Sequence, residues 1–180
     1  MIRMRYFYSG LAVLGIVIAA CSRPPAPAVA VKADPMAKAD AATLAIVAGI
    51  RATGTQFDSS VEVKPLRDPA VDGLLKQAHD LEAQQQIAPA IDAVHKALKI
   101  APNAPDILQY EAELQILAHD WKQAGGLAQK AWELGPKVGA LCARNQQTLI
   151  HVREAQGDTA GATQAKQQLS GCKVPAPARY

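Results

Sequence analysis

Cysteine and histidine are the residue types in this chain whose spacing could indicate chemistry. The 180 residues include 3 cysteines and 4 histidines. The histidines lie far apart, and none has a second histidine and a carboxylate at ligand spacing: His79, His95, His119 and His151. No HExxH, CxxC, GxSxG or glycine-rich phosphate loop occurs, so no nucleophile is paired with a base. We therefore expect no enzyme, with no catalytic residues and no metal site.

Cys21 directly follows an apolar leader. Residues 1–10 carry Arg3 and Arg5 without an acidic residue, and residues 11–20 are all apolar or small. This pattern is typical of a secretory signal peptide, which we place at residues 1–20. Crossing a bilayer takes about 20 apolar residues, and this run is roughly half that length. We therefore do not expect a permanent spanning anchor.

The end of the leader, Ile18-Ala19-Ala20-Cys21, resembles the bacterial lipobox. The resemblance implies that the Cys21 thiol receives diacylglycerol and that its amine receives an acyl chain, with no other cofactor. Ser22 follows, where aspartate would favour inner-membrane retention, so the resemblance implies an address on the inner leaflet of the outer membrane, facing the periplasm. The alternative is an ordinary secreted protein in which Cys21 is incidental.

Residues 21–40 form the predicted linker. They contain Pro24, Pro25, Pro27 and Pro35 among alanines and have almost nothing to bury. Such a composition predicts a flexible, partly polyproline tether, and at about 3.1 Å per residue it could hold a folded domain several nanometres from the bilayer.

Residues 41–68 are predicted to contain a short helix and an extended lead-in. Leu44, Val47, Ala48 and Arg51 have helical spacing within residues 41–51, which indicates one weak apolar face. Residues 53–60 are rich in turn formers, and residues 60–65 alternate like a strand without a strand partner. We expect the latter to lie as an extended segment on the first helical hairpin.

A degenerate repeat organises the rest of the chain. Residues 90–102 return thirty-four positions later as residues 124–136, with small, large apolar and proline positions matched. Alanines recur where two antiparallel helices would touch, and a proline closes each unit. This pattern resembles the tetratricopeptide repeat (TPR) family and, with the lipobox, a TPR bacterial lipoprotein. The resemblance implies an all-α domain at residues 69–172, with about three helix hairpins in a short right-handed solenoid.

Proline, glycine and aspartate predict the helix boundaries. Asp68-Pro69 reads as a helix start, and this first helix should end near residue 84. The following helices are expected at about 88–100, 106–119, 122–134, 137–155 and 159–169. The third hairpin is about one turn longer than the others. Residues 173–180 are predicted to be a disordered tail.

Cys142 and Cys172 lie fifteen residues either side of Gly157, the predicted turn of the third hairpin. In an antiparallel hairpin, the start of the first helix lies beside the end of the second, so the two thiols can meet. In an oxidising periplasm we predict a disulfide, which in the chain-entropy account contributes about 3–4 kcal/mol. Two separately buried thiols are the alternative.

The second repeat departs from the family pattern at Glu111 and Gln115, where large apolar residues are usual. A buried carboxylate needs a partner, and we expect Glu111 to find Asn145 or Arg144 in the next unit. Trp121 is predicted to belong to the core.

In TPR arrays the first helix of every unit lines a concave groove. Carried over by position, the resemblance implies a partner-binding groove lined by Leu75, His79, Glu82, Gln109, Glu113, Ile116, Arg144, Gln147 and His151. The polar residues would supply hydrogen bonds, while Leu75 and Ile116 would supply apolar anchors. The alternative is a merely solvated helix face.

Charge argues against nucleic-acid binding. The formal net charge is +3, and removal of the leader with Arg3 and Arg5 leaves 17 basic against 16 acidic residues, without a basic cluster. We therefore predict an outer-membrane-anchored lipoprotein that binds an envelope protein or peptide as a scaffold or assembly factor. One alternative is a small-molecule or glycan-binding lipoprotein, with a ligand held by His79, Glu113, Arg144 and His151. Another is a structural spacer without a ligand.

Overall fold

The computed structural model describes residues 39–57 and 66–173. All of them belong to one compact unit, Lys32–Tyr180. The predicted signal peptide, the lipidation site Cys21, nearly all of the linker, the extended segment 60–65 and the tail from residue 174 lie outside the described residues.

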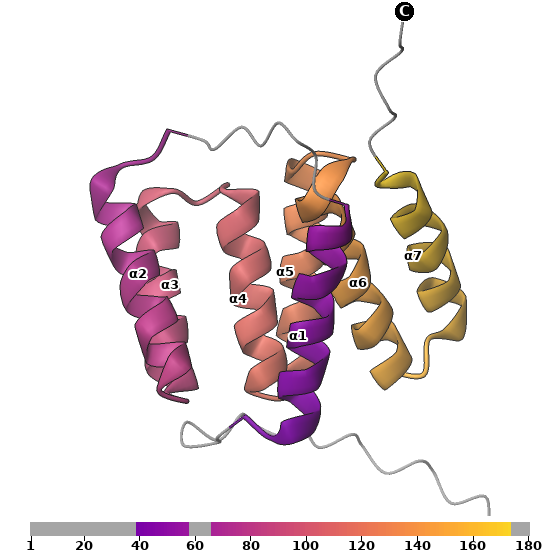
Figure 1. Cartoon of the computed structure of the whole chain (residues 1–180), viewed down its shortest axis with the longest axis horizontal. Helices are drawn as coiled ribbons and strands as arrows, with labels where there is room; N and C mark the ends of the chain where they lie inside the picture. The colour runs from indigo at the N-terminus through magenta and orange to yellow at the C-terminus, as the bar shows by residue number, and fades with distance from the viewer. Residues whose placement is uncertain (1–38, 58–65, 174–180) are drawn as a thin grey trace, which may run out of the picture. The chain divides into compact units, whose positions relative to one another are not determined.

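Seven α-helices account for most of the described chain (Figure 1). Their bounds are α1 Ala41–Gln56, α2 Pro69–Ala83, α3 Ile87–Ile100, α4 Pro105–Leu117, α5 Trp121–Leu134, α6 Gly139–Ala155 and α7 Thr159–Gly171. The described residues contain no β-strand. The predicted all-α class is therefore confirmed.

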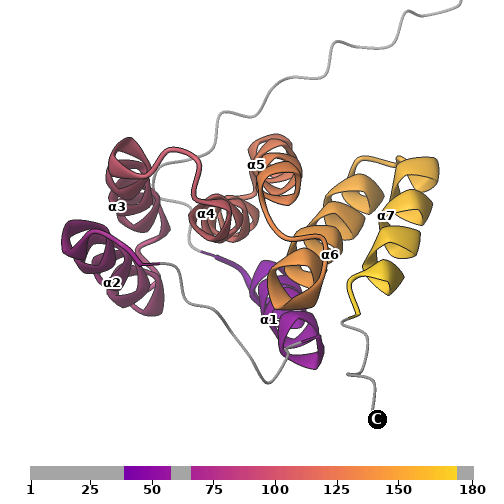
Figure 2. The same cartoon turned by 90° about the horizontal axis from the view of Figure 1, so that it is seen from above.

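Six of the helices form three consecutive hairpins, in which α2 packs on α3, α4 on α5 and α6 on α7. Figure 2 shows α2, α4 and α6 on the side that faces α1, with α3, α5 and α7 on the opposite side. We call the first three the inner helices and the other three the outer helices. This is the hairpin order that the repeat predicts.

The hairpin turns repeat in their backbone conformation. Gln85 and His119, thirty-four residues apart, both have φ of 60°, and Gly157, thirty-eight residues further on, has φ of 74°. In each turn the next N–H donates to the carbonyl five residues before it, as from Asp120 to Gln115 at 2.9 Å. The left-handed residue and this bond are typical of a Schellman helix end. Because α6 has 17 residues and α4 has 13, the last unit is longer by about one turn.

Local side-chain chemistry starts and stops these helices. The Asp68 carboxylate accepts the Ala70 N–H at 2.8 Å, and Pro69 occupies the first turn of α2. Lys137, predicted to begin a helix, instead donates through its ammonium to the Glu133 carbonyl at 3.0 Å. This contact satisfies the end of α5, where a cation is favourable, and α6 begins two residues later.

Alanines bring the helices close together. Ala78, Ala90, Ala97, Ala124 and Ala131 are completely buried at positions that recur with the repeat. Their small side chains permit close helix packing, so the core needs few of the large aromatic residues, which make up 4% of the sequence.

Helix α1 is longer than predicted, because it continues through the turn formers to Gln56. The Thr53 hydroxyl donates to the Gly49 carbonyl at 2.9 Å, and the Thr55 hydroxyl donates to the Ala52 carbonyl at 2.7 Å. These hydroxyls are therefore satisfied within the helix instead of competing with it.

The third hairpin is closed by a disulfide between Cys142 and Cys172, whose Cα atoms are 5.6 Å apart. Both residues are buried, together with Ala143 and next to the partly buried Phe57. The bridge joins the start of α6 to the end of α7, where the two predicted thiols meet.

Glu111 does not contact Asn145 or Arg144, so the partner predicted for its carboxylate is wrong. The Glu111 carboxylate contacts the His95 ring on α3 at 2.7 Å, so it faces back toward the preceding hairpin. Arg144 pairs with Glu113 instead, and the fully buried Asn145 amide has no partner among the described residues. Glu111 and Glu113 are two residues apart in α4, which is about half a helical turn, so they lie on opposite sides of the helix. Trp121 is partly buried against the main core, as predicted.

Candidate functional site

Helix α1 lies on the face that the inner helices present (Figures 1 and 2). It packs along α6 and also contacts α4. The residues of α1 that become buried are Thr43, Val47, Ile50 and Gly54, which recur on one side of the helix. The predicted groove is therefore partly filled by the chain's own helix.

A buried ion-pair network joins α1 to the inner helices. Glu113 on α4 is completely buried, and its carboxylate accepts the Arg51 Nε–H of α1 at 2.8 Å. Arg144 on α6 donates to both oxygens of the same carboxylate, at 2.7 and 2.8 Å. The Gln109 amide adds a bond at 2.9 Å. Charged, bidentate hydrogen bonds of this kind fix both distance and orientation.

The network extends to α2 through Glu82. Its carboxylate accepts Arg51 Nη1 at 2.9 Å and the Tyr110 hydroxyl at 2.9 Å. The His79 ring stacks on Tyr110, with centroids 4.3 Å apart. Three helices and α1 are thus tied together by one continuous set of polar contacts.

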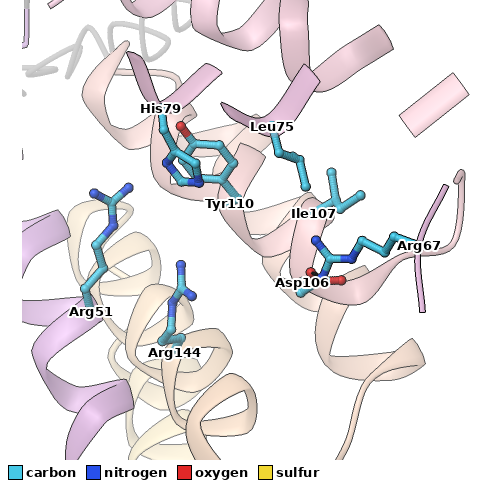
Figure 3. A pocket seen from close by; sticks show the side chains of 8 residues that line it. All are labelled: Arg51, Arg67, Leu75, His79, Asp106, Ile107, Tyr110 and Arg144. Carbon is cyan, nitrogen blue, oxygen red and sulfur yellow. Dashed lines mark hydrogen bonds and ion pairs between the residues drawn. The ribbon is translucent and has the colours of Figure 1, made fainter. Parts of the chain in front are cut away.

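Between α1 and α2 a cavity of about 150 Å³ remains open to solvent (Figure 3). Its lining combines cationic, aromatic and aliphatic groups: Arg51, Arg67, Leu75, His79, Asp106, Ile107, Tyr110 and Arg144. In Figure 3 the guanidiniums of Arg51 and Arg144 point toward the His79–Tyr110 pair, while Arg67 lies against Asp106 at the other end. Arg67 and Asp106 form an ion pair there.

The surroundings shift the pKa values of three groups in this network. Partial burial lowers the pKa of His79, and the Arg51 and Arg144 charges lower it further against the opposing Glu82. Burial and the Glu82 carboxylate raise the pKa of the Tyr110 phenol. Burial alone would lower the pKa of Arg51, but Glu113 and Glu82 outweigh it and raise that pKa. At neutral pH the site therefore combines neutral His79 and Tyr110 with permanent guanidinium charges.

The nine residues predicted to line the groove have different environments. Leu75, His79 and Arg144 line the cavity. Gln109, Glu113 and Ile116 have no exposed surface, so they do not line an open groove as expected. Glu113 is covered in part by Arg51 of α1, and Gln109 is bonded to Thr148 of α6. Glu82 is bonded to Arg51 and Tyr110, and Gln147 and His151 contact each other at 3.1 Å without lining the cavity.

The sequence does not predict two of the residues that line the cavity, Arg51 and Tyr110. It places Arg51 only on the weak apolar face of a short helix, and it indicates no site for Tyr110. One signal could have pointed to Arg51, since it is the only charged residue within residues 41–56. A single cation in an otherwise uncharged helix indicates a specific partner.

Within the described residues, no cluster of three or more His, Cys, Asp or Glu could hold a metal ion. None of the helices within the described residues is long and apolar enough to cross a membrane.

Comparison with known proteins leaves the family open and supports the fold. No protein-family model matches the sequence, and no curated protein matches it. Among solved structures, the globular C-terminal domain of P. aeruginosa LpoP matches with a TM-score of 0.53 and 28% sequence identity. The match covers 58% of this chain and 99% of that domain. The chain is therefore similar, over more than half of its length, to a complete globular domain from the C-terminal part of another protein.

Proposed function

We propose that this protein is a lipid-anchored adaptor of the outer membrane, facing the periplasm, whose helical domain binds a partner protein of the cell envelope. The observation that carries the proposal is α1 itself. It lies on the inner helices through a seam of small and aliphatic residues and a specific ion pair, as a bound helical ligand would. An inner face that accepts one helix in this way is suited to protein recognition.

The likeness to the LpoP domain supports the same plan. The matched domain is the C-terminal one of that protein, and in this chain the hairpins follow the predicted leader and linker. A membrane anchor at one end and a globular helical domain at the other suit a protein that holds a partner at a fixed distance from the membrane. On this ground we propose an assembly or scaffold role for this chain.

The cavity between α1 and α2 is the accessible part of this face. Leu75 and Ile107 provide an apolar floor, while His79 and Tyr110 offer an aromatic pair beside the arginines. One side chain of a partner segment can insert here while its neighbours lie along α2. Aromatic and arginine groups are the usual anchors of such contacts.

The size of the cavity favours a protein partner over a small molecule. His79 and Arg144 line the cavity, but Glu113 is completely buried against Arg144 and His151 does not line the cavity. Pockets for small ligands enclose about 300–1,000 Å³. A volume of about 150 Å³ suits a single inserted side chain better than a whole glycan.

Site-specific photo-crosslinking in cells tests the proposal. A photoreactive amino acid replaces His79, which is partly exposed at the cavity, or exposed Lys130 on the outer helix α5 as the control. We expect one discrete adduct from position 79 that is absent at position 130 and lost when Tyr110→Ala is added. Adducts at neither position, or equal adducts at both, would exclude this face as the binding site.

A further inference from the structure

We infer that the inner face beneath α1 is a receptor for a partner's amphipathic helix, and that α1 is a resident occupant which this helix replaces. The inference rests on the proposed function and identifies the kind of partner. The partner helix should reproduce the features by which α1 is held: a narrow seam of small and β-branched residues and one arginine beside it.

The seam defines the shape of the helix that fits. Thr43, Val47, Ile50 and Gly54 follow spacings of four, three and four residues, so they lie on one side of α1. At Gly54 the helix lies close to α6, because an added Cβ would lie 2.7 Å from Arg144 Cγ and 2.9 Å from its Cδ. The face therefore requires glycine at the last seam position and compact side chains before it.

The buried carboxylate of Glu113 defines the charge. It meets Arg51, sixty-two residues away in the chain, and both carboxylate oxygens also accept from Arg144. Arg51 Nη2 is buried and has no hydrogen-bond partner among the described residues, so the pair does not use all of its donors. A partner helix should therefore carry an arginine at the position of Arg51, directly after the third seam residue. This arginine would bind Glu113 and, as a second acceptor, Glu82.

Helix α1 is held more lightly than α4 and α6, the two helices on which it packs. Four of its 16 residues are buried, against 11 of the 13 residues in α4 and 8 of the 17 in α6. The contacts at the ends of α1 are few: Asp40 lies 3.6 Å from the His119 ring, and Ala39 and Phe57 are partly buried against the core. Gly49, in the middle of α1, faces open space, where glycine weakens a helix without any gain in packing. Elements with few buried contacts open before the core does.

Two glycines of α1 allow a matched test in the full mature chain. Gly49→Ala adds a methyl group into open space and should hold α1 in place more firmly. Gly54→Ala adds the same methyl group against Arg144 and should release α1. The two variants therefore make the same chemical change on the same helix with opposite expected effects.

The probe is a synthetic fluorescent peptide with the sequence of residues 40–57, which retains Gly54, and its binding is followed by fluorescence anisotropy. We expect the peptide to bind the Gly54→Ala protein at least about tenfold more tightly than the wild type, since a tethered α1 competes at high effective concentration. The Gly49→Ala protein should bind it more weakly than the wild type. A peptide with Arg51→Ala should lose at least about tenfold in affinity for the Gly54→Ala protein. Equal binding by all three proteins, or by both peptides, overturns the inference.

Hydrogen exchange of the wild-type protein tests the inference without any variant, so the result does not depend on whether a variant folds. We expect the backbone amides of α1 to exchange at least tenfold faster than those of α4. Equal protection of α1 and α4 would mean that α1 leaves only on global unfolding, and the inference would fail. The photo-crosslink from position 79 separates the two proposals, because it can persist when peptide binding and fast exchange are both absent.

Discussion

At the scale of single residues, Glu113 is the most constrained side chain of the site. It is completely buried, and it accepts hydrogen bonds from Gln109, Arg51 and Arg144. A carboxylate in such a position is stable only while its partners remain, and each partner arginine depends on it in turn. The identity of this one residue therefore links the position of α1 to the core of the domain.

Replacing Glu113 by glutamine should lower the free energy of unfolding by about 2–3 kcal/mol. The change preserves size but leaves Arg144 without its anion and Arg51 with Glu82 alone. Hydrogen bonds to charged groups contribute about 1.5–3 kcal/mol each. Partial exposure of both arginines moderates the loss. Urea unfolding measures the effect, with exposed Glu133→Gln on α5 as a control that should change stability by less than about 0.5 kcal/mol.

The partly buried histidines predict a dependence of stability on pH. Burial lowers the pKa of His79 and His151 below the usual 6.5. The unfolded chain therefore takes up protons on these rings at a higher pH than the folded one, so the free energy of unfolding falls as the pH drops from about 7 to about 5. The double variant His79→Gln, His151→Gln should flatten this part of the profile. NMR titration of the ring protons gives the two pKa values directly, and values at or above 6.5 would contradict the prediction.

At the scale of elements, the three hairpins share one turn with different residues at its left-handed position. Gln85 and His119 adopt positive φ at a cost that glycine does not have, whereas Gly157 occupies the same place in the third turn. Gln85→Gly should thus raise the free energy of unfolding by about 0.5–1 kcal/mol. Gly157→Ala should lower it by about 1 kcal/mol through the backbone alone, because an added Cβ there contacts nothing within 4 Å. Thermal unfolding of both variants checks the opposite signs.

The Cys142–Cys172 bridge should make the last hairpin sensitive to reduction. It closes a loop with a sequence separation of 30 residues, for which the chain-entropy account gives about 3–4 kcal/mol. Reductant should lower the midpoint of urea unfolding of the wild type and leave the double variant Cys142→Ala, Cys172→Ala unchanged. Two thiols that alkylate freely in the denatured, unreduced protein would contradict the bridge.

At the scale of the whole molecule, the predicted anchor decides where the domain works. Labelled palmitate should be incorporated into the wild-type protein and not into Cys21→Ala. Several acyl chains hold a protein durably, since each buried methylene contributes about 0.8 kcal/mol. Ser22→Asp should shift the labelled protein from the outer to the inner membrane. Label that persists on Cys21→Ala would exclude this site of lipidation.

Much of the fold could be predicted because its determinants are local. Asp68 and Pro69 start a helix by capping and by a preset φ, and these effects depend only on neighbouring residues. The thirty-four-residue period predicted the first two hairpin turns, and Gly157 predicted the third. The direction in which Glu111 points could not be predicted in this way, because helical register alone leaves open which neighbouring helix a polar side chain will face.

The sequence by itself determined seven helices, their pairing into hairpins and the meeting of two cysteines, because periodicity, caps and turns act over a few residues. Only the tertiary structure decided that α1 covers the inner helices and that Arg51 reaches Glu113 from sixty-two residues away. A weakly amphipathic helix carries no local signal for the surface it will cover. Its place depends on the shape and charge of a face that exists only after the hairpins have packed.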